Sequence, residues 1–166
     1  MRYVVHNHIQ ALDNGLDNEF ADALKQARAI DPMKYFPGLK RITLTPDTDK
    51  WNAAYVPDKD EMIIQAKFHK KTFMDKVQTL LHEIGHRGQF TADPATFKAF
   101  TKAGLVQIGF FLAMANAVHQ EDYRKNGIGR KELADEVFAE SYSRYALGLP
   151  MPADLRGFWA TRGSER

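Results

Sequence analysis

Two histidines stand four residues apart, with a glutamate beside the first, in the segment His82-Glu83-Ile84-Gly85-His86. Residues at this spacing share one face of an α-helix, so both imidazoles can point at one metal ion. The adjacent carboxylate can reach a water held by that metal without being a ligand itself. Zinc acidifies such a water and polarises a carbonyl. The predicted chemistry is therefore hydrolysis with one zinc ion, and Glu83 is the group that takes the proton.

A catalytic zinc site usually carries three protein ligands, so the two histidines leave one position to fill. The chain has no cysteine, which leaves histidine and carboxylate side chains as the candidates. Asp93 precedes Pro94 and is better explained as a helix N-cap. His119 lies in an apolar stretch, where a lone histidine is more often a packing residue.

Three glutamates at four-residue spacing, Glu132, Glu136 and Glu140, share one face of a later predicted helix. Apolar residues surround the last two, so this part of the helix should be buried. A buried carboxylate needs a partner, and we therefore predict Glu136 as the third zinc ligand. Glu140, one turn further on, should accept the free N–H of a ligand histidine and so fix its tautomer.

The two motifs resemble those of the gluzincin clan of zinc peptidases. The nearest likeness is the anthrax lethal-factor type of catalytic domain, which has HExGH and then an E-x-F-A-E helix, matched here by residues 136–140. The resemblance implies Glu136 as the glutamate ligand and Glu83 as the residue that activates the water. The residues Asn52, Ala53 and Ala54 also resemble the edge strand of thermolysin-like enzymes, along which a substrate backbone adds as a further strand.

The chain departs from this family in two places. Arg87 is charged where zincins usually carry an uncharged residue after the second histidine. Lethal-factor-type enzymes also have a tyrosine a few residues before the glutamate ligand, as an oxyanion partner, and none stands near Ile128-Gly129. Tyr123 lies further upstream and is the first candidate for this donor, with His119 as the other option.

The elements that must position these residues are predicted from periodicity and from turn and cap residues. They are a strand near Val4–Val5, a helix near 17–30, a strand at 41–45, a hairpin of 52–56 and 61–66, and helices at 72–88, from 94, at 104–123 and at 130–147. The predicted fold class is α+β and zincin-like. It has a small twisted sheet in the N-terminal lobe, an active-site helix and a helical C-terminal lobe.

Length and composition predict one domain over residues 1–166, and the resemblance implies that it is a zincin-like metallopeptidase domain. With 44% hydrophobic and 11% aromatic residues, the chain can bury a core. We expect a mixed α/β lobe at 1–90, with the HExxH helix, and a helical lobe at 91–166, with the glutamate ligand. The formal charge of +2 is spread along the chain, which does not indicate a nucleic-acid partner.

The most apolar stretch, residues 104–118, is shorter than the about 20 residues that span a bilayer, and it contains Gln107 and Asn116. We therefore predict a buried core helix and no membrane insertion. No secretory signal is visible at the N-terminus, so the expected localisation is soluble and cytoplasmic by default, with export by another route left open. The oligomeric state is not specified by the sequence.

Three functions fit these patterns. The first is a peptidase that cuts a peptide or protein bound along the Asn52–Val56 edge. The second is a catalytically inactive zincin-fold module that binds or regulates a partner, and the third is a metal-free helical protein in which HExxH is accidental. Glu83 favours the first, because a purely structural zinc site needs no carboxylate beside a water.

Overall fold

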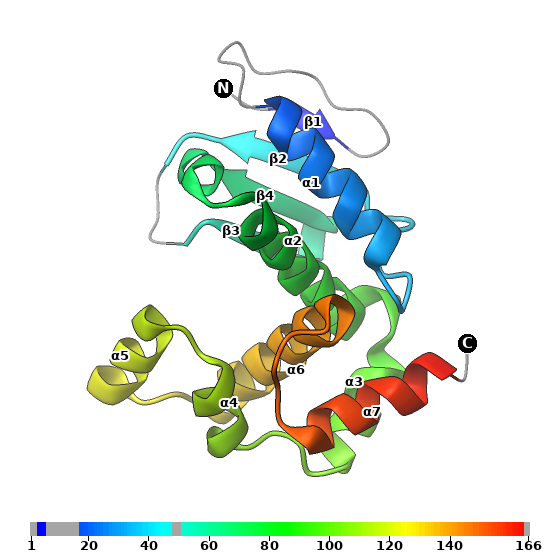
Figure 1. Cartoon of the computed structure of the whole chain (residues 1–166), viewed down its shortest axis with the longest axis vertical. Coiled ribbons are helices and arrows are strands. Elements are labelled where there is room, and N and C mark those ends of the chain that lie inside the picture. The colour runs from blue at the N-terminus through cyan, green and yellow to red at the C-terminus, as the bar shows by residue number, and fades with distance from the viewer. Residues whose placement is uncertain (1–2, 6–16, 48–50, 165–166) are drawn as a thin grey trace.

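The structure is a computed structural model that describes residues 3–5, 17–47 and 51–164 (Figure 1). The described strands are β1 (Tyr3–Val5), β2 (Arg41–Thr45), β3 (Ala53–Val56) and β4 (Glu61–Gln65). The described α-helices are α1 (Asp17–Ile30), α2 (Phe73–Arg87), α3 (Pro94–Lys102), α4 (Ile108–Met114), α5 (Ala117–Asn126), α6 (Arg130–Leu147) and α7 (Ala153–Ser164). Single turns of other helix types are η1 (Pro57–Lys59), η2 (Ala66–Lys70) and the π-helical η3 (Gly88–Ala92). The predicted α+β class is confirmed.

The four strands form one sheet in the order β1-β2-β4-β3. β2 and β4 are parallel, whereas β1 and β3 run antiparallel to their neighbours. The predicted hairpin is confirmed, with Ala54 opposite Ile63 and η1 in the connection. Its turn closes through Asp60, whose φ of 46° is left-handed and whose carboxylate accepts a hydrogen bond from the Tyr55 hydroxyl at 2.7 Å. In the order β1-β2-β4-β3, strand β3 lies at the edge of the sheet.

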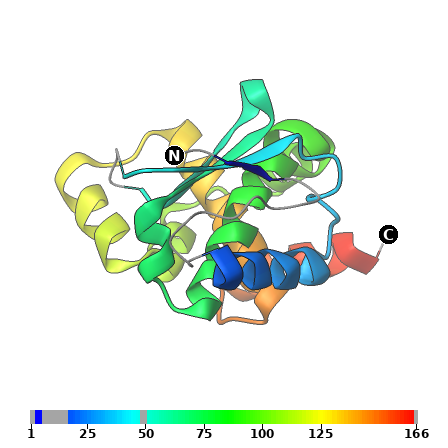
Figure 2. The same ribbon diagram turned by 90° about the horizontal axis from the view of Figure 1, so that it is seen from above.

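Helices α1 and α2 lie side by side on one face of the sheet (Figures 1 and 2). The apolar side chains of this layer are fully or almost fully buried: Phe20, Ala23, Ile42, Leu44, Met62, Ile64, Phe68, Val77, Leu80 and Ile84. This core packs one face of α2 against the sheet and α1. The opposite face of α2 packs against α6 in the second half of the chain.

Local capping sets the ends of α2, as the sequence predicted. The Thr72 hydroxyl accepts the Asp75 backbone N–H at 3.2 Å, and the α-helix ends at Arg87. The π turn η3 continues from Gly88, where a Cβ atom would lie 2.3 Å from the Tyr35 ring, so only glycine fits. Asp93 then caps α3, because its carboxylate accepts the Thr96 N–H.

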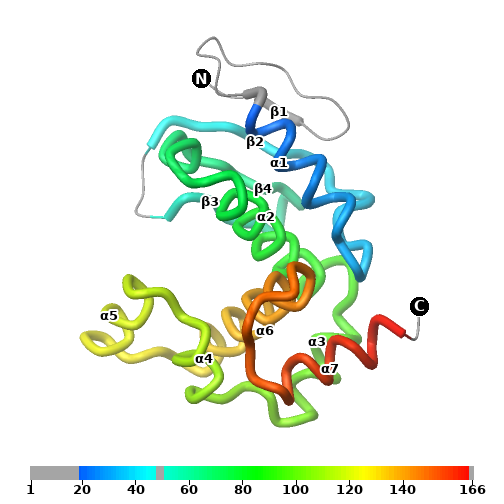
Figure 3. The backbone as a smooth tube through the Cα atoms, in the orientation of Figure 1, coloured from blue at the N-terminus to red at the C-terminus, as the bar shows by residue number. Residues whose placement is uncertain are grey.

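The second half of the chain is helical and centres on α6 (Figure 3). Phe100 of α3, Phe138 of α6 and Trp159 of α7 pack edge to face in its core. The Trp159 indole N–H donates to the Ser141 hydroxyl at 2.9 Å, which satisfies both buried groups. α6 ends as predicted at Gly148, whose φ of +67° is the left-handed conformation of a helix C-cap.

The prediction of one core helix across residues 104–123 is wrong. The chain forms two helices, α4 and α5, with a break at Ala115–Asn116, and α5 buries none of its residues. The cause is Asn116, whose side chain accepts the His119 backbone N–H at 2.8 Å and so starts a new helix. None of the helices in the described ranges is long and apolar enough to cross a membrane.

Candidate metal centre

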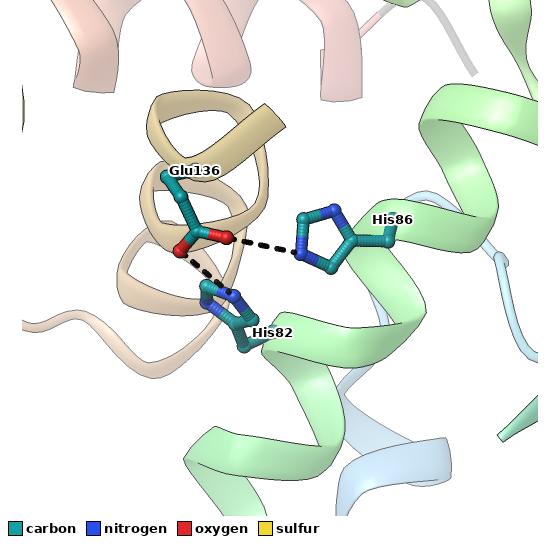
Figure 4. Close-up of side chains that lie close together, drawn as sticks. All are labelled: His82, His86 and Glu136. Carbon is teal, nitrogen blue, oxygen red and sulfur yellow. Dashed lines mark ion pairs between the residues drawn. The ribbon is translucent and has the colours of Figure 1, made fainter. Parts of the chain in front are cut away.

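Helix α2 presents His82 and His86 on the face that meets α6 (Figure 4). Their ring centroids lie 4.9 Å apart, with the planes at 81° to each other. Glu136 of α6 points between them, with its Oε2 at 3.5 Å from His82 Nε2 and its Oε1 at 3.7 Å from His86 Nε2. All three ligand atoms lie within 4.8 Å of one another, so these side chains could hold one metal ion.

The close approach of α2 and α6 depends on two small residues. A Cβ atom on Gly85 would lie 3.0 Å from Cα and 3.3 Å from the carbonyl oxygen of Ala139. Gly85 stands between the two histidines, and Ala139 stands one turn after Glu136. A larger side chain at either position would separate the helices and withdraw the carboxylate from the imidazoles.

Glu140 orients His82 through the ring nitrogen that does not face Glu136. The Nδ1 of His82 lies 3.0 Å from Glu140 Oε1, and the second oxygen of this carboxylate accepts from Arg144 Nε at 2.8 Å and from Gln78 Nε2 at 3.0 Å. Burial alone would raise the pKa of Glu140, but the hydrogen bond and charge of His82, together with Arg144, lower it to about 2. Because Nδ1 donates to this carboxylate, Nε2 of His82 faces Glu136.

The pKa values of the two imidazoles move in opposite directions. Burial alone would lower the pKa of His82, but the hydrogen bond that its Nδ1 donates to Glu140 and the charges of the surrounding carboxylates raise it to about 10. Burial and the nearby positive His82 lower the pKa of His86 to about 4, against the opposing charge of Glu136. The surrounding carboxylates thus favour the protonated form at His82 more than at His86.

Sequence reasoning missed the partners of His86. Its Nδ1 lies 3.3 Å from Gln89 Oε1, and the Gln89 amide nitrogen donates to Asp135. A signal was available, because a ligand histidine needs a partner on its free ring nitrogen and Gln89 follows one turn later. Asp135 directly precedes Glu136 but gives no such signal on its own.

Glu83 lies beside the histidines and is only 8% exposed. Its carboxylate accepts a hydrogen bond from the backbone N–H of Tyr55 in β3. Burial raises the pKa of Glu83 to about 7, with a further contribution from Glu136, while the charge of His82 acts in the opposite direction. The edge strand therefore holds Glu83 in place.

The two histidines, Glu83, Glu136 and Glu140 line one cleft of about 770 Å³. One wall is the edge of the sheet, including the predicted residues Asn52, Ala53 and Ala54. The floor is α2, and the other walls are α6 and the α4–α5 connection. Trp51, Phe90 and Val118 line the cleft with 37%, 39% and 74% of their surface exposed, so it offers apolar as well as polar contacts.

No protein-family model, curated protein or solved structure matches this chain. Three side chains that could hold a metal ion, a buried carboxylate and the edge strand β3 share the cleft.

The two candidate oxyanion donors lie in different places. Tyr123 packs against Phe111, with 6.0 Å between ring centroids, and is not among the described residues that line the cleft. His119, one turn earlier on α5, is exposed and lines the cleft. Of the two, only His119 is presented to a molecule bound there.

Arg87 lies on a different face of α2 from the histidines. Its guanidinium pairs with Asp60 through Nε at 2.8 Å and donates through Nη1 to the carbonyl oxygens of Tyr35 and Pro37 at 2.7 and 3.0 Å. Both charges of the ion pair are buried. The charged residue after the second histidine therefore connects α2 to the hairpin turn and to the loop after α1.

Proposed function

We propose that this chain is a zinc-dependent peptidase of the gluzincin type, with a zincin-like fold, in which His82, His86 and Glu136 hold one zinc ion. The supporting observation is the meeting of three ligand atoms from two helices. Tetrahedral zinc with Zn–N distances of about 2.0–2.1 Å keeps its ligand atoms about 3.3 Å apart. His82 Nε2 and His86 Nε2 lie 3.5 and 3.7 Å from the two different oxygens of Glu136, and one atom from each residue lies within 4.8 Å of the others, so the three side chains can close on one zinc ion.

The ligand set favours a catalytic rather than a structural site. Structural zinc is usually closed by four protein ligands, often including cysteine, whereas catalytic zinc keeps one position open beside three protein ligands. Among the described residues, only these three side chains form a group of metal-binding type. When bound, zinc would polarise a substrate carbonyl and lower the pKa of a water molecule.

The chain's own groups supply the remaining steps. Glu83 accepts the proton of the attacking water and passes it to the leaving amine. The Tyr55 N–H fixes the Glu83 carboxylate, and the same strand offers its free edge to the substrate backbone. An extended peptide paired with β3 would lie along the cleft that His82, His86 and Glu136 line.

His119 is the better candidate for the donor that stabilises the developing oxyanion. We expect His119→Ala to lower kcat/KM about tenfold, which is less than the 10²–10³ of a donor in a water-excluded site, because His119 is exposed. Tyr123→Phe should leave kcat/KM unchanged, since its ring packs on Phe111. Steady-state kinetics on one cleaved peptide compares the two variants. A loss of activity in Tyr123→Phe but not in His119→Ala would identify Tyr123 as the oxyanion donor.

Metal analysis combined with a peptide library tests the proposed function. The purified protein should contain one zinc ion per chain and cleave members of a degenerate peptide library. Dialysis against a chelator should abolish cleavage, and added zinc should restore it. A protein that takes up no zinc under these conditions would show that HExxH is accidental here.

A further inference from the structure

The two ligand histidines differ in what holds their second ring nitrogen. His82 Nδ1 meets the carboxylate of Glu140 directly at 3.0 Å. His86 Nδ1 meets an amide oxygen, that of Gln89, at 3.3 Å, and the Gln89 amide nitrogen donates to Asp135. Gln89 is 3% exposed, and Asp135 is half-buried on α6, directly before Glu136.

The donors and acceptors in the chain from His86 through Gln89 to Asp135 follow from the chemistry of the three groups. A carboxylate only accepts hydrogen bonds, so the NH₂ group of Gln89 must face Asp135 and its carbonyl oxygen must face His86. A carbonyl oxygen also only accepts, so His86 Nδ1 must carry a proton. A neutral imidazole has one proton, and His86 Nε2 therefore presents its lone pair on the side of Glu136, 3.7 Å away.

The π turn η3 supplies this contact. Such turns are rare, and they occur frequently at functional sites. The wider turn, closed by the Asp93 N–H on the Gly88 carbonyl at 2.8 Å, places Gln89 against Nδ1 of His86. It also places Phe90 in a stacked arrangement with the same ring, with the planes 25° apart. One turn of chain thus supplies the Nδ1 partner of His86 and an aromatic ring whose centroid lies 6.5 Å from that of the imidazole.

We propose that Gln89 and Asp135 are positioning residues that hold His86 in the tautomer and orientation required of a metal ligand, as Glu140 does for His82. This inference rests on the proposed zinc site. Its consequence is that α6 orients both histidines: Glu140 acts on His82 directly, and Asp135 acts on His86 through Gln89.

Zinc affinity of the full chain, measured by competition with a chromophoric chelator, tests this role without an activity assay. Gln89→Leu should weaken zinc binding about 10–100-fold, the range for the loss of an outer partner of a ligand. Asp135→Asn should also weaken it, because an asparagine can donate to Gln89 and let its amide flip. Glu132→Gln is the matched control, since it removes one carboxylate from α6 that also lines the cleft.

The double variant separates positioning from charge. If Asp135 acts through Gln89, then Asp135→Asn in the Gln89→Leu background should weaken binding no further than Glu132→Gln does. Thermal unfolding of the zinc-free proteins identifies a variant that fails to fold. Should Gln89→Leu fail to fold, Gln89→Met replaces it, because methionine keeps the length of the side chain and lacks both the amide oxygen that faces His86 and the amide N–H that donates to Asp135. In zinc-loaded wild type, the NMR signal of the His86 Nδ1 proton should be protected from solvent exchange, and this protection should be lost in the Gln89 variant.

The outcomes distinguish this inference from the function on which it rests. Wild type that binds zinc, with a folded Gln89 variant that binds it equally well, overturns the inference and leaves the peptidase proposal standing. Independent, multiplying effects of the Gln89 and Asp135 changes also overturn it. Wild type that binds no zinc overturns both proposals together.

Discussion

Glu83→Gln should lower peptide hydrolysis by about 10²–10⁴-fold while leaving zinc content unchanged. Glutamine has the shape of glutamate, and its carbonyl oxygen can still accept the Tyr55 N–H that anchors the side chain. It cannot take a proton from water. The variant therefore removes proton transfer and keeps both the fold and the metal-binding residues.

The measurement pairs kcat/KM on one cleaved peptide with zinc analysis of the same preparation. Asp75→Asn is the matched control, because Asp75 is an acidic residue of α2 that also lines the cleft, at the far end from His86. We expect this control to keep wild-type activity. Equal activity in the Glu83 variant would contradict the role of Glu83 as base. Zinc binding without hydrolysis in the wild type itself would support the inactive binding or regulatory module.

The parts of the fold that were predicted correctly depend on local signals. The Thr72 side chain caps α2 through the Asp75 N–H, three residues away in the sequence. The η1 turn joins two apolar runs of strand length, β3 and β4. Gly148 ends α6 because it is the residue at that point that adopts positive φ without strain. Such features act within a few residues, and the sequence alone therefore predicts them.

The parts that were missed depend on contacts between distant segments. α7 was not predicted, because it buries only Leu155 and Trp159 and carries two glycines, so its apolar periodicity is weak. Its position is set by the packing of Trp159 on Phe138 and Tyr142. The apolar run of residues 104–118 predicts a continuous helix, whereas the single capping residue Asn116 interrupts it and starts α5.

The candidate site also combines features that local sequence determines with features that depend on contacts between distant segments. The spacing of His82 and His86 follows from helix geometry, and that part needed no tertiary information. Glu136 was selected for its apolar surroundings, and the described structure brings it to both imidazoles. The support of His86 by Gln89 and Asp135 was not predicted, because it requires a π turn and the crossing of α2 with α6 at Gly85 and Ala139.

Replacement of Glu136 by alanine should weaken zinc binding by more than about 100-fold, beyond the about 10–100-fold range of outer partners such as Glu140. Glu136 is the only carboxylate within 4 Å of both Nε2 atoms among the described residues, so its loss leaves two ligands and no substitute. Glu132→Ala is the control: it removes the carboxylate one turn earlier on the same helix, which also lines the cleft.

Competition titration of wild type, Glu132→Ala, Glu136→Ala and Glu140→Gln separates coordination from electrostatic attraction. A glutamate that only attracts the cation through the field of the cleft would be replaceable by any of its neighbours, and both alanine variants would then lose affinity to a similar, small extent. Coordination depends instead on the position of one oxygen pair between two imidazoles. We therefore expect Glu132→Ala to bind zinc like wild type and Glu140→Gln to fall between the two alanine variants. Equal losses in Glu132→Ala and Glu136→Ala would mean that the histidines recruit another ligand, and that α6 contributes charge rather than a bond.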